Sequence, residues 1–253
     1  MSEQRIDRST PVLRSLAEQT TEELGGRLSV LSRQKHDHMT LDRMLTELPG
    51  APGDEEEALL NRICRLVFSH AFAEEAVLWP ALRRALPDGE ELTAQVEREH
   101  QEITELVATL EATGPGDPTR PELIARTVEV LRQDVRDEED ELLPRLQQEV
   151  DTGTLRRLGV TWELVRRTAP TRAHPIVARR PPGNVLAALP LSLIDRIRDG
   201  LDRTSRRLGP SARRALQSSS QGLGRVARRV EQSWLLRRGE RSDTHVPREW
   251  RPR

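Results

Sequence analysis

The stretch HAFAEEAVLWPAL, residues 70–82, recurs 64 residues further along the chain as DVRDEEDELLPRL, residues 134–146. Both copies carry two adjacent glutamates, a leucine and a proline at the same spacing. They differ at the first position, where His70 is replaced by Asp134. The repetition of this helix-end sequence indicates two related halves in one domain. The exchange of histidine for aspartate raises the question of whether a site is removed or adjusted.

Apolar side chains recur at helical spacing on both sides of the two copies. The pattern predicts four long helices, over residues 21–48, 54–85, 90–112 and 121–150, joined by short segments rich in proline and glycine. Short connections make consecutive long helices antiparallel. The sequence therefore predicts an all-α fold with an up-down antiparallel four-helix bundle over residues 21–168, including a short fifth helix near residues 155–167.

The remaining segments differ in character from this bundle. We expect a flexible N-terminus over residues 1–20, a C-terminal extension with an amphipathic helix over residues 169–203, and a basic, arginine-rich tail over residues 204–253. In the extension, Leu193, Ile194, Ile197 and Leu201 fall on one helix face. The tail is expected to be partly helical, near residues 223–238 after a Ser/Gln/Gly-rich linker at 218–224, and partly disordered.

Composition limits the class of protein. Forty basic side chains balance 41 acidic ones, but the acids concentrate in the bundle and the arginines in the tail. Cys64 is the only cysteine, which excludes an intrachain disulfide and fits a reducing compartment. The N-terminus lacks the apolar segment of a signal peptide, and no apolar run reaches the ~20 residues of a membrane span. We therefore expect a soluble, cytoplasmic protein.

Ionisable side chains interrupt the apolar stripe of every predicted bundle helix. The interruptions are His38 on the first helix, His70 and Glu74 on the second, His100 on the third, and Asp134 and Glu138 on the fourth. Such groups are costly to bury unless they are paired or bind a metal. A single histidine on an apolar face is usually a hydrogen-bonded core residue, and seam carboxylates can be a solvated edge. Six such groups at matching heights instead favour a metal site.

The chemistry of these donors narrows the choice of metal. Imidazole with carboxylate suits iron, manganese or zinc, whereas calcium prefers oxygen ligands alone. A ferritin-like site requires Glu-x-x-His twice, and only Glu97 with His100 provides that spacing. His36 is expected to face outward, His174 to lie in a turn, and Cys64 to be a packing residue.

These motifs resemble the hemerythrin-like, HHE cation-binding domain. The features that carry the resemblance are H-x-x-x-E-E-x-x-L-x-P from His70, the seam His38, the Glu99-His100 pair and the second E-E-x-x-L-L-P element. The segment from Ala169 to Asp199 also looks like the C-terminal extension of actinobacterial members. The resemblance implies a non-haem di-iron centre inside a four-helix bundle. By position it implies His38, His70, Glu74, His100 and Glu138 as ligands, with Glu74 and Glu138 as bridges.

The sequence departs from that family pattern at two positions. Asp134 stands where the fourth helix carries a histidine, and Thr104 stands where oxygen-carrying hemerythrins place another. More carboxylate and less imidazole favours ferric iron or manganese over reversible oxygen carriage. Asp134 is shorter than histidine, so direct binding, binding through water, no binding and a one-metal site all remain open.

Two classes of function follow from the sequence. The first is a metal protein that senses or reacts with dioxygen or peroxide, with catalase- or peroxidase-like activity as its enzymatic form and Glu75, Glu139 or Thr104 supporting the ligands. The second is a metal-poor interaction protein whose basic tail contacts an anionic membrane or nucleic acid. A tail that only packs on the acidic bundle, or is disordered, is the simpler alternative. No specific nucleic-acid target or oligomeric state is indicated.

Overall fold

The computed structural model describes residues 13–114, 116–180, 182–206 and 208–238. Within these ranges helices are the regular secondary structure and no β-strand occurs, which confirms the all-α prediction. No helix in the described part is long and apolar enough to cross a membrane.

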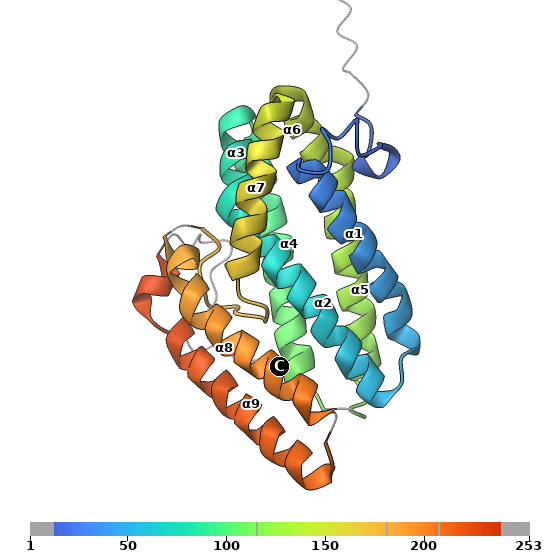
Figure 1. The fold of residues 1–253 in the computed structure, drawn as a ribbon, viewed down its shortest axis with the longest axis vertical. Helices are drawn as coiled ribbons and strands as arrows, with labels where there is room; N and C mark the ends of the chain where they lie inside the picture. The colour runs from blue at the N-terminus through green and yellow to red at the C-terminus, as the bar shows by residue number, and fades with distance from the viewer. Residues whose placement is uncertain (1–12, 115, 181, 207, 239–253) are drawn as a thin grey trace, which may run out of the picture.

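Nine α-helices are assigned within the described ranges: α1 Val30–Glu47, α2 Gly53–Ala73, α3 Trp79–Ala85, α4 Gly89–Ala112, α5 Arg120–Asp137, α6 Leu143–Glu149, α7 Thr152–Thr168, α8 Gly183–Ser205 and α9 Pro210–Glu231. Short 3₁₀ turns occupy Leu16–Glu18, Leu48–Gly50 and Trp234–Arg237. The long helices α1, α2, α4 and α5 run roughly alongside one another (Figure 1).

The duplicated stretch forms the same local structure twice. A π-helical turn, Glu74–Leu78, joins α2 to α3, and a second, Glu138–Leu142, joins α5 to α6. Each turn is followed within two residues by a proline, which lacks an N–H and crowds the carbonyl four residues earlier. A wider π turn accommodates this loss. Such turns are rare and often lie at functional sites, and both begin at a predicted ligand, Glu74 or Glu138.

The core consists of two apolar layers. One layer joins α1, α2, α4 and α5 through residues such as Leu45, Ile63, Ile103 and Leu131. The other surrounds Trp79 and Trp162 toward the opposite end of the helices. Along each of the four helices, the predicted ligands fall between residues of the two layers. The polar seam groups therefore occupy a buried level between two apolar ones.

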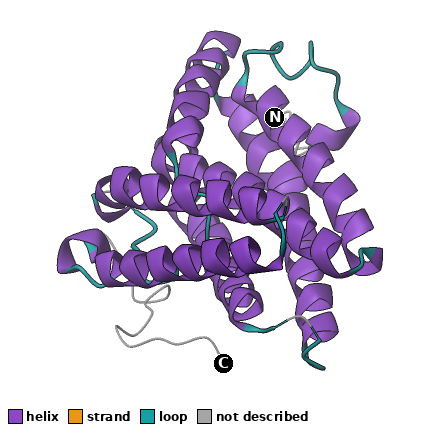
Figure 2. Ribbon diagram, turned by 60° about the horizontal axis from the view of Figure 1, so that its bottom comes forward, coloured by secondary structure: helices purple, strands orange, loops and turns teal. Residues whose placement is uncertain are grey.

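The segments beyond the four long helices cover one flank of the molecule. Helix α7 packs along α1 and α2 and buries Trp162. Helices α8 and α9 form an antiparallel hairpin that crosses the outside of the long helices (Figures 1 and 2). The irregular segment at residues 169–182 connects α7 to this hairpin and lies against α2 and α4.

Several predicted boundaries were wrong. The first helix begins at Val30, not residue 21, because Ser29 caps it and turns with positive φ at Gly25 and Gly26 precede it. The expected linker at 218–224 lies inside α9, and only a 3₁₀ turn follows at Trp234–Arg237. Residues 1–12 and 239–253, which include part of the expected flexible N-terminus, the expected disordered end and His245, lie outside the described residues.

Candidate metal centre

All six predicted side chains meet in one buried layer. They are His38 from α1, His70 from α2, His100 from α4, Asp134 from α5, and Glu74 and Glu138 from the first residue of each π turn. Each is at most 8% exposed. Helical spacing accounts for this convergence, since every one of them lies on the apolar stripe of its helix.

One half of the layer joins α1, α2 and both π turns. His38 Nε2 lies 3.3 Å from His70 Nε2 and 3.2 Å from Glu138 Oε2. His70 Nε2 lies 3.0 Å from Glu74 Oε1. One donor atom from each of these four residues falls within 4.8 Å of the others, which is close enough for one metal ion.

The other half joins α4 and α5. His100 Nε2 lies 3.6 Å from Asp134 Oδ1, 3.8 Å from Glu138 Oε1 and 3.7 Å from Glu74 Oε2. His100, Asp134 and Glu138 form the second group whose donor atoms could hold an ion. Asp134 therefore takes part in the cluster.

The two halves share Glu74 and Glu138. Each glutamate turns one oxygen toward the His38–His70 side and the other toward His100. A carboxylate placed in this way can bridge two cations. This is the arrangement that the sequence resemblance implied for these two residues.

Each histidine of the cluster has a carboxylate on its outer ring nitrogen. Glu139 Oε1 lies 2.8 Å from His38 Nδ1, Asp37 Oδ2 lies 3.3 Å from His70 Nδ1, and Glu75 Oε1 lies 3.0 Å from His100 Nδ1. Since a carboxylate accepts, Nδ1 donates its proton outward and Nε2 faces the cluster, where loss of its proton would leave a lone pair for a cation. This pattern of outer partners is typical of metal-binding histidines.

Sequence reasoning identified two of the three outer carboxylates, Glu75 and Glu139, and missed Asp37. Asp37 is beside the apolar stripe of α1, where an acidic residue normally faces solvent, so no sequence signal marked it. The third proposed supporting residue, Thr104, contacts Arg179, whose guanidinium donates to the Thr104 hydroxyl. The same hydroxyl donates to the carbonyl of His100, one helical turn earlier.

Electrostatics within the layer reflect an excess of carboxylate over imidazole. Burial lowers the pKa of His38, but Glu138 and Glu139 outweigh it and raise the pKa to about 9. Burial likewise opposes charge on His70 and His100, yet neighbouring carboxylates raise the pKa of each well above its usual value. The histidines thus carry the compensating positive charge, which a bound cation would replace by releasing protons.

The carboxylates respond in opposite directions. Burial tends to raise the pKa of Glu138, but His100 and His38 lower it to about 2. Burial dominates at Asp134 and, with the negative charge of Glu138, raises its pKa well above the usual value despite His100. Glu138 therefore favours its charged form, whereas Asp134 favours its neutral form.

Unsatisfied oxygens show that the donor set fits a cation. Both carboxylate oxygens of Glu74, Oδ1 of Asp134 and Oε1 of Glu138 are buried without a hydrogen-bond donor. Buried carboxylate oxygens normally accept a hydrogen bond or bind a metal. These atoms are also the ones that face the shared centre, so a metal would satisfy them together.

Aromatic rings enclose the cluster on two sides. Trp162 of α7 meets His70 edge-on at 5.3 Å between ring centroids, and Trp79 stacks against His100 at 6.2 Å. Both indoles are fully buried. A cavity of about 20 Å³ beside His38, His70 and Asp134 has room for a water-sized molecule.

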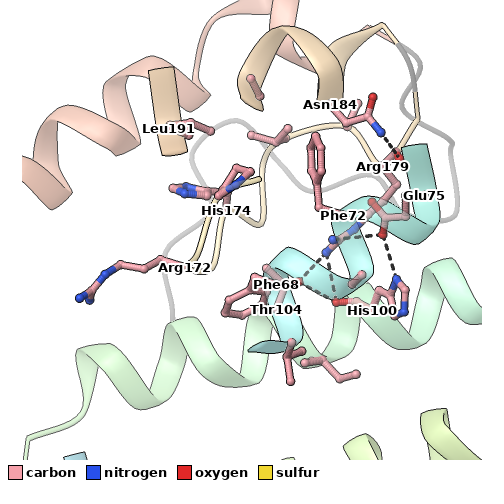
Figure 3. A pocket seen from close by; sticks show the side chains of 17 residues that line it. Phe68, Phe72, Glu75, His100, Thr104, Arg172, His174, Arg179, Asn184 and Leu191 are labelled. Carbon is pink, nitrogen blue, oxygen red and sulfur yellow. Dashed lines mark hydrogen bonds and ion pairs between the residues drawn. The ribbon is translucent and has the colours of Figure 1, made fainter. Parts of the chain in front are cut away.

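The 169–182 segment completes the surroundings of His100. Figure 3 shows Arg179 reaching toward Glu75 and the α4 backbone, beside a cavity of about 50 Å³. The Arg179 guanidinium lies 3.4 Å from Glu75 Oε1 and donates to the carbonyl of His100 at 3.1 Å. Arg179 had not been identified from the sequence, because 79 residues separate it from His100 and 104 from Glu75.

The remaining candidates lie outside the cluster. His36 is exposed, as expected, and Cys64 is a buried free thiol. Glu97 pairs with Arg83 and Arg180, which removes it from a ferritin-like role. His174 is no simple turn residue, because it is clamped between Asp195 Oδ2 at 3.0 Å and Glu231 Oε1 at 2.9 Å.

Comparison with known proteins adds a family to this geometry. Residues 29–146 match the model of the hemerythrin HHE cation binding domain. The hemerythrin-like segment runs from the cap of α1 to the middle of α6 and contains all six clustered residues and the three outer carboxylates. It leaves out α7, the 169–182 segment and the α8–α9 hairpin.

One similar protein is an uncharacterized hemerythrin-like protein of Schizosaccharomyces pombe (strain 972). It is 23% identical over 135 residues, which cover 53% of this chain and 66% of that protein, just under two thirds of its length. No solved structure matches the chain. The comparisons therefore support a hemerythrin-like cation-binding segment built on α1–α6.

Proposed function

We propose that the protein is a hemerythrin-like non-haem di-iron protein, of the type with a C-terminal extension found in actinobacteria, that senses or reacts with dioxygen or peroxide. The observation that carries the proposal is the pair of adjoining donor groups that share Glu138, with Glu74 turned toward both. A lone structural metal would need one closed set of four ligands. Two sets joined by carboxylates suit two ions.

The proposed bundle consists of α1, α2, α4 and α5, and each of these helices contributes a ligand to one of the two irons. His38 and His70 would hold one iron, and His100 with Asp134 the other, with Glu74 and Glu138 between them. Three imidazoles and three carboxylates suit iron, while manganese or zinc would also be accepted by these donors. The high carboxylate content favours the ferric state.

Bound iron supplies reversible one-electron chemistry and affinity for small oxygen species. The protein supplies the rest. Asp37, Glu75 and Glu139 fix the orientation of the three imidazoles, and Trp79 and Trp162 exclude bulk water. The cavities of about 20 and 50 Å³ beside the cluster have room for ligands of a few atoms, which fits dioxygen or peroxide.

Metal content per chain after anaerobic purification tests the proposal. We expect two irons per wild-type chain and their loss in His70→Ala, read by elemental analysis and by the optical spectrum of the oxidised protein. The Met39→Gln chain serves as a control, because Met39 is exposed on the same helix as His38. A wild type that binds no metal after ferrous loading would instead favour an interaction protein without a metal centre.

Peroxide consumption then separates the two roles. An enzyme of catalase type releases oxygen from peroxide faster than the same concentration of free ferrous iron does. A sensor changes its spectrum on exposure to dioxygen or peroxide without such turnover. An iron-loaded protein that neither turns over peroxide nor changes its spectrum on exposure to dioxygen or peroxide contradicts the proposed reactivity while leaving metal binding in place.

A further inference from the structure

Helix α8 turns one row of aliphatic side chains to solvent, while its opposite face buries two aspartates beside Ala187 and Leu191. Leu189, Leu193 and Ile197 are 73%, 63% and 46% exposed, whereas Asp195 and Asp199 are 0% and 6% exposed. The three aliphatics are spaced four residues apart and form one row along the helix. The sequence placed Leu193 and Ile197 on one apolar helix face, and an ordinary surface helix turns such a face inward, whereas here both side chains are exposed.

The buried aspartates fix that orientation. Asp195 accepts hydrogen bonds from the backbone N–H groups of Thr171 and Arg172 and lies 3.0 Å from His174 Nε2. Asp199 pairs with the Arg172 guanidinium at 2.8 Å. Rotating α8 to bury its leucines would break this network and leave buried charges without partners, which is costly. The exposed row is therefore a stable feature of the fold.

Helix α7 extends the apolar surface. Val160 and Leu164, one turn apart, are 56% and 66% exposed. The end of α7 touches α8, where Arg196 donates to the carbonyl of Arg167. Val185 and Leu186, at the start of α8, are 54% and 49% exposed. Exposed aliphatic side chains gathered in this way mark an interaction surface.

The exposed charged side chains that residues 155–238 contribute are arginines. Between residues 155 and 238, every acidic side chain in the described part is at least partly buried. Arginines of α7, α8 and α9 are exposed in the same region, including Arg196, Arg203, Arg228 and Arg229. Trp234, beyond α9, is 63% exposed beside Arg238. Aliphatics, arginines and an exposed indole together suit an interface between an apolar phase and anionic groups.

We propose that the outer face of α7, α8 and α9 docks on an anionic lipid surface. The aliphatic row enters the boundary between headgroups and acyl chains, and the arginines contact lipid phosphates. Two copies of the chain facing each other would bring their arginines together. A nucleic acid would satisfy the arginines but leave Leu189 and Leu193 in water. The proposal does not depend on the metal centre.

Vesicle sedimentation with the full chain tests the proposal. We expect the wild type to bind vesicles of phosphatidylglycerol and phosphatidylcholine, and to bind phosphatidylcholine alone far more weakly. The double variant Leu189→Gln/Leu193→Gln should bind the anionic vesicles with an affinity reduced by about tenfold, because two inserting side chains are lost. Arg228→Gln/Arg229→Gln should bind more weakly at low salt and differ less from the wild type at high salt.

Matched controls carry the same changes on the bundle. Leu28 and Met39 are 54% and 57% exposed, so Leu28→Gln/Met39→Gln should bind vesicles as the wild type does. Arg43→Gln/Arg62→Gln removes two exposed arginines from α1 and α2 and should have the same lack of effect. Because all these positions are exposed, helix content measured by circular dichroism should stay unchanged in every variant.

Three results would overturn the proposal. The first is no binding of the wild type to anionic vesicles, and the second is equal binding by the Leu189→Gln/Leu193→Gln variant. The third is a dimer in analytical ultracentrifugation that this variant converts to a monomer, because the face would then be an interface between copies. Tight DNA binding that the leucine variant retains, without vesicle binding, would assign the arginines to nucleic acid instead.

Discussion

The guanidinium of Arg179 lies 3.4 Å from Glu75 Oε1, the same oxygen that meets His100 Nδ1 at 3.0 Å. A residue outside the hemerythrin-like segment is thereby linked to a candidate ligand inside it. Replacing Arg179 by glutamine removes the charge that holds Glu75 and frees the outer side of His100. We expect a loss of iron affinity of about tenfold, the lower end of the range for outer partners of metal ligands.

Competition with a ferrous chelator measures this change without reference to activity. Arg179→Lys should restore part of the affinity, since lysine keeps the charge but not the planar fork. Arg126→Gln is the matched control, because Arg126 forms only exposed ion pairs far from the cluster. Equal affinities of the Arg179→Gln chain and the wild type would show that the 169–182 segment has no influence on the centre.

Alanine substitutions at Glu138 and at Asp134 should leave different numbers of metal ions in the protein. Glu138 faces both halves of the cluster, whereas Asp134 belongs only to the half that contains His100. We expect Glu138→Ala to lose both irons and Asp134→Ala to keep about one per chain by elemental analysis. Glu102→Ala, a change at an exposed acid on α4, serves as the control. Loss of both irons in the Asp134 variant would contradict two separable halves.

Asp134→His gives the second copy of the duplicated stretch the same first residue as the first copy, which begins with His70. The added imidazole should raise ferrous affinity and shift the visible absorption of the oxidised protein, because nitrogen is a softer donor than carboxylate oxygen. Asp134→Asn, which removes the charge at nearly constant size, separates the effect of charge from that of the new nitrogen. An unchanged spectrum and affinity in the histidine variant would show that Asp134 does not bind the metal.

The cluster was predictable because each of its members replaces an apolar residue on a helix stripe. His38, His100 and Asp134 occupy positions where a leucine or valine was expected, so helical spacing alone directed them inward. The two π turns were not predicted, although Pro80 and Pro144 mark the position of a helix irregularity in both copies. The four long helices were likewise readable from their stripes and from the Pro/Gly segments between them.

Interactions between distant segments could not be predicted in the same way. The orientation of α8 depends on Asp195 and Asp199 meeting Arg172 and His174, whose positions are set only when the 169–182 segment folds over α2 and α4. A hydrophobicity pattern places leucines inward by default and cannot weigh that network. The early start predicted for the first helix failed for a local reason, since Gly25 and Gly26 adopt conformations that stop a helix.

His174 should make stability depend on pH. Burial lowers the pKa of His174, but Asp195 and Glu231 outweigh it and raise the pKa from 6.5 to about 10. Because the folded pKa lies above the unfolded one, this contribution is fully present below pH ~6.5 and is lost as the pH rises through about 10. The pKa of Asp195 is lowered despite its burial, mainly by His174, so its own contribution is lost in acid, as the pH falls below ~3.8.

Urea unfolding of His174→Gln beside the wild type measures this dependence. The difference in free energy of unfolding should be greatest near pH 6 and should shrink by on the order of 3–5 kcal/mol by pH ~10.5. The exposed His36→Gln serves as the control and should track the wild type throughout. A difference that stays constant from pH ~6 to ~10.5 would mean that His174 acts through packing and not through its charge.

Gly159 should be the least replaceable glycine of α7. A Cβ at this position would collide with the carbonyl oxygen of Leu28 and the backbone nitrogen of Val30, so the helix rests directly on the chain that enters α1. Backbone atoms cannot move aside as a side chain does, and α7 would have to withdraw and carry Trp162 away from His70. We expect Gly159→Ala to destabilise the protein by about 3 kcal/mol or more in urea unfolding.

Gly200→Ala is the counterpart, because no atom lies within 4 Å of its added Cβ inside α8. There the methyl group restricts only the unfolded chain and should stabilise by about 0.5–1 kcal/mol. A tolerated alanine at 159 would show that α7 does not sit closely enough on α1 to hold Trp162 against the cluster.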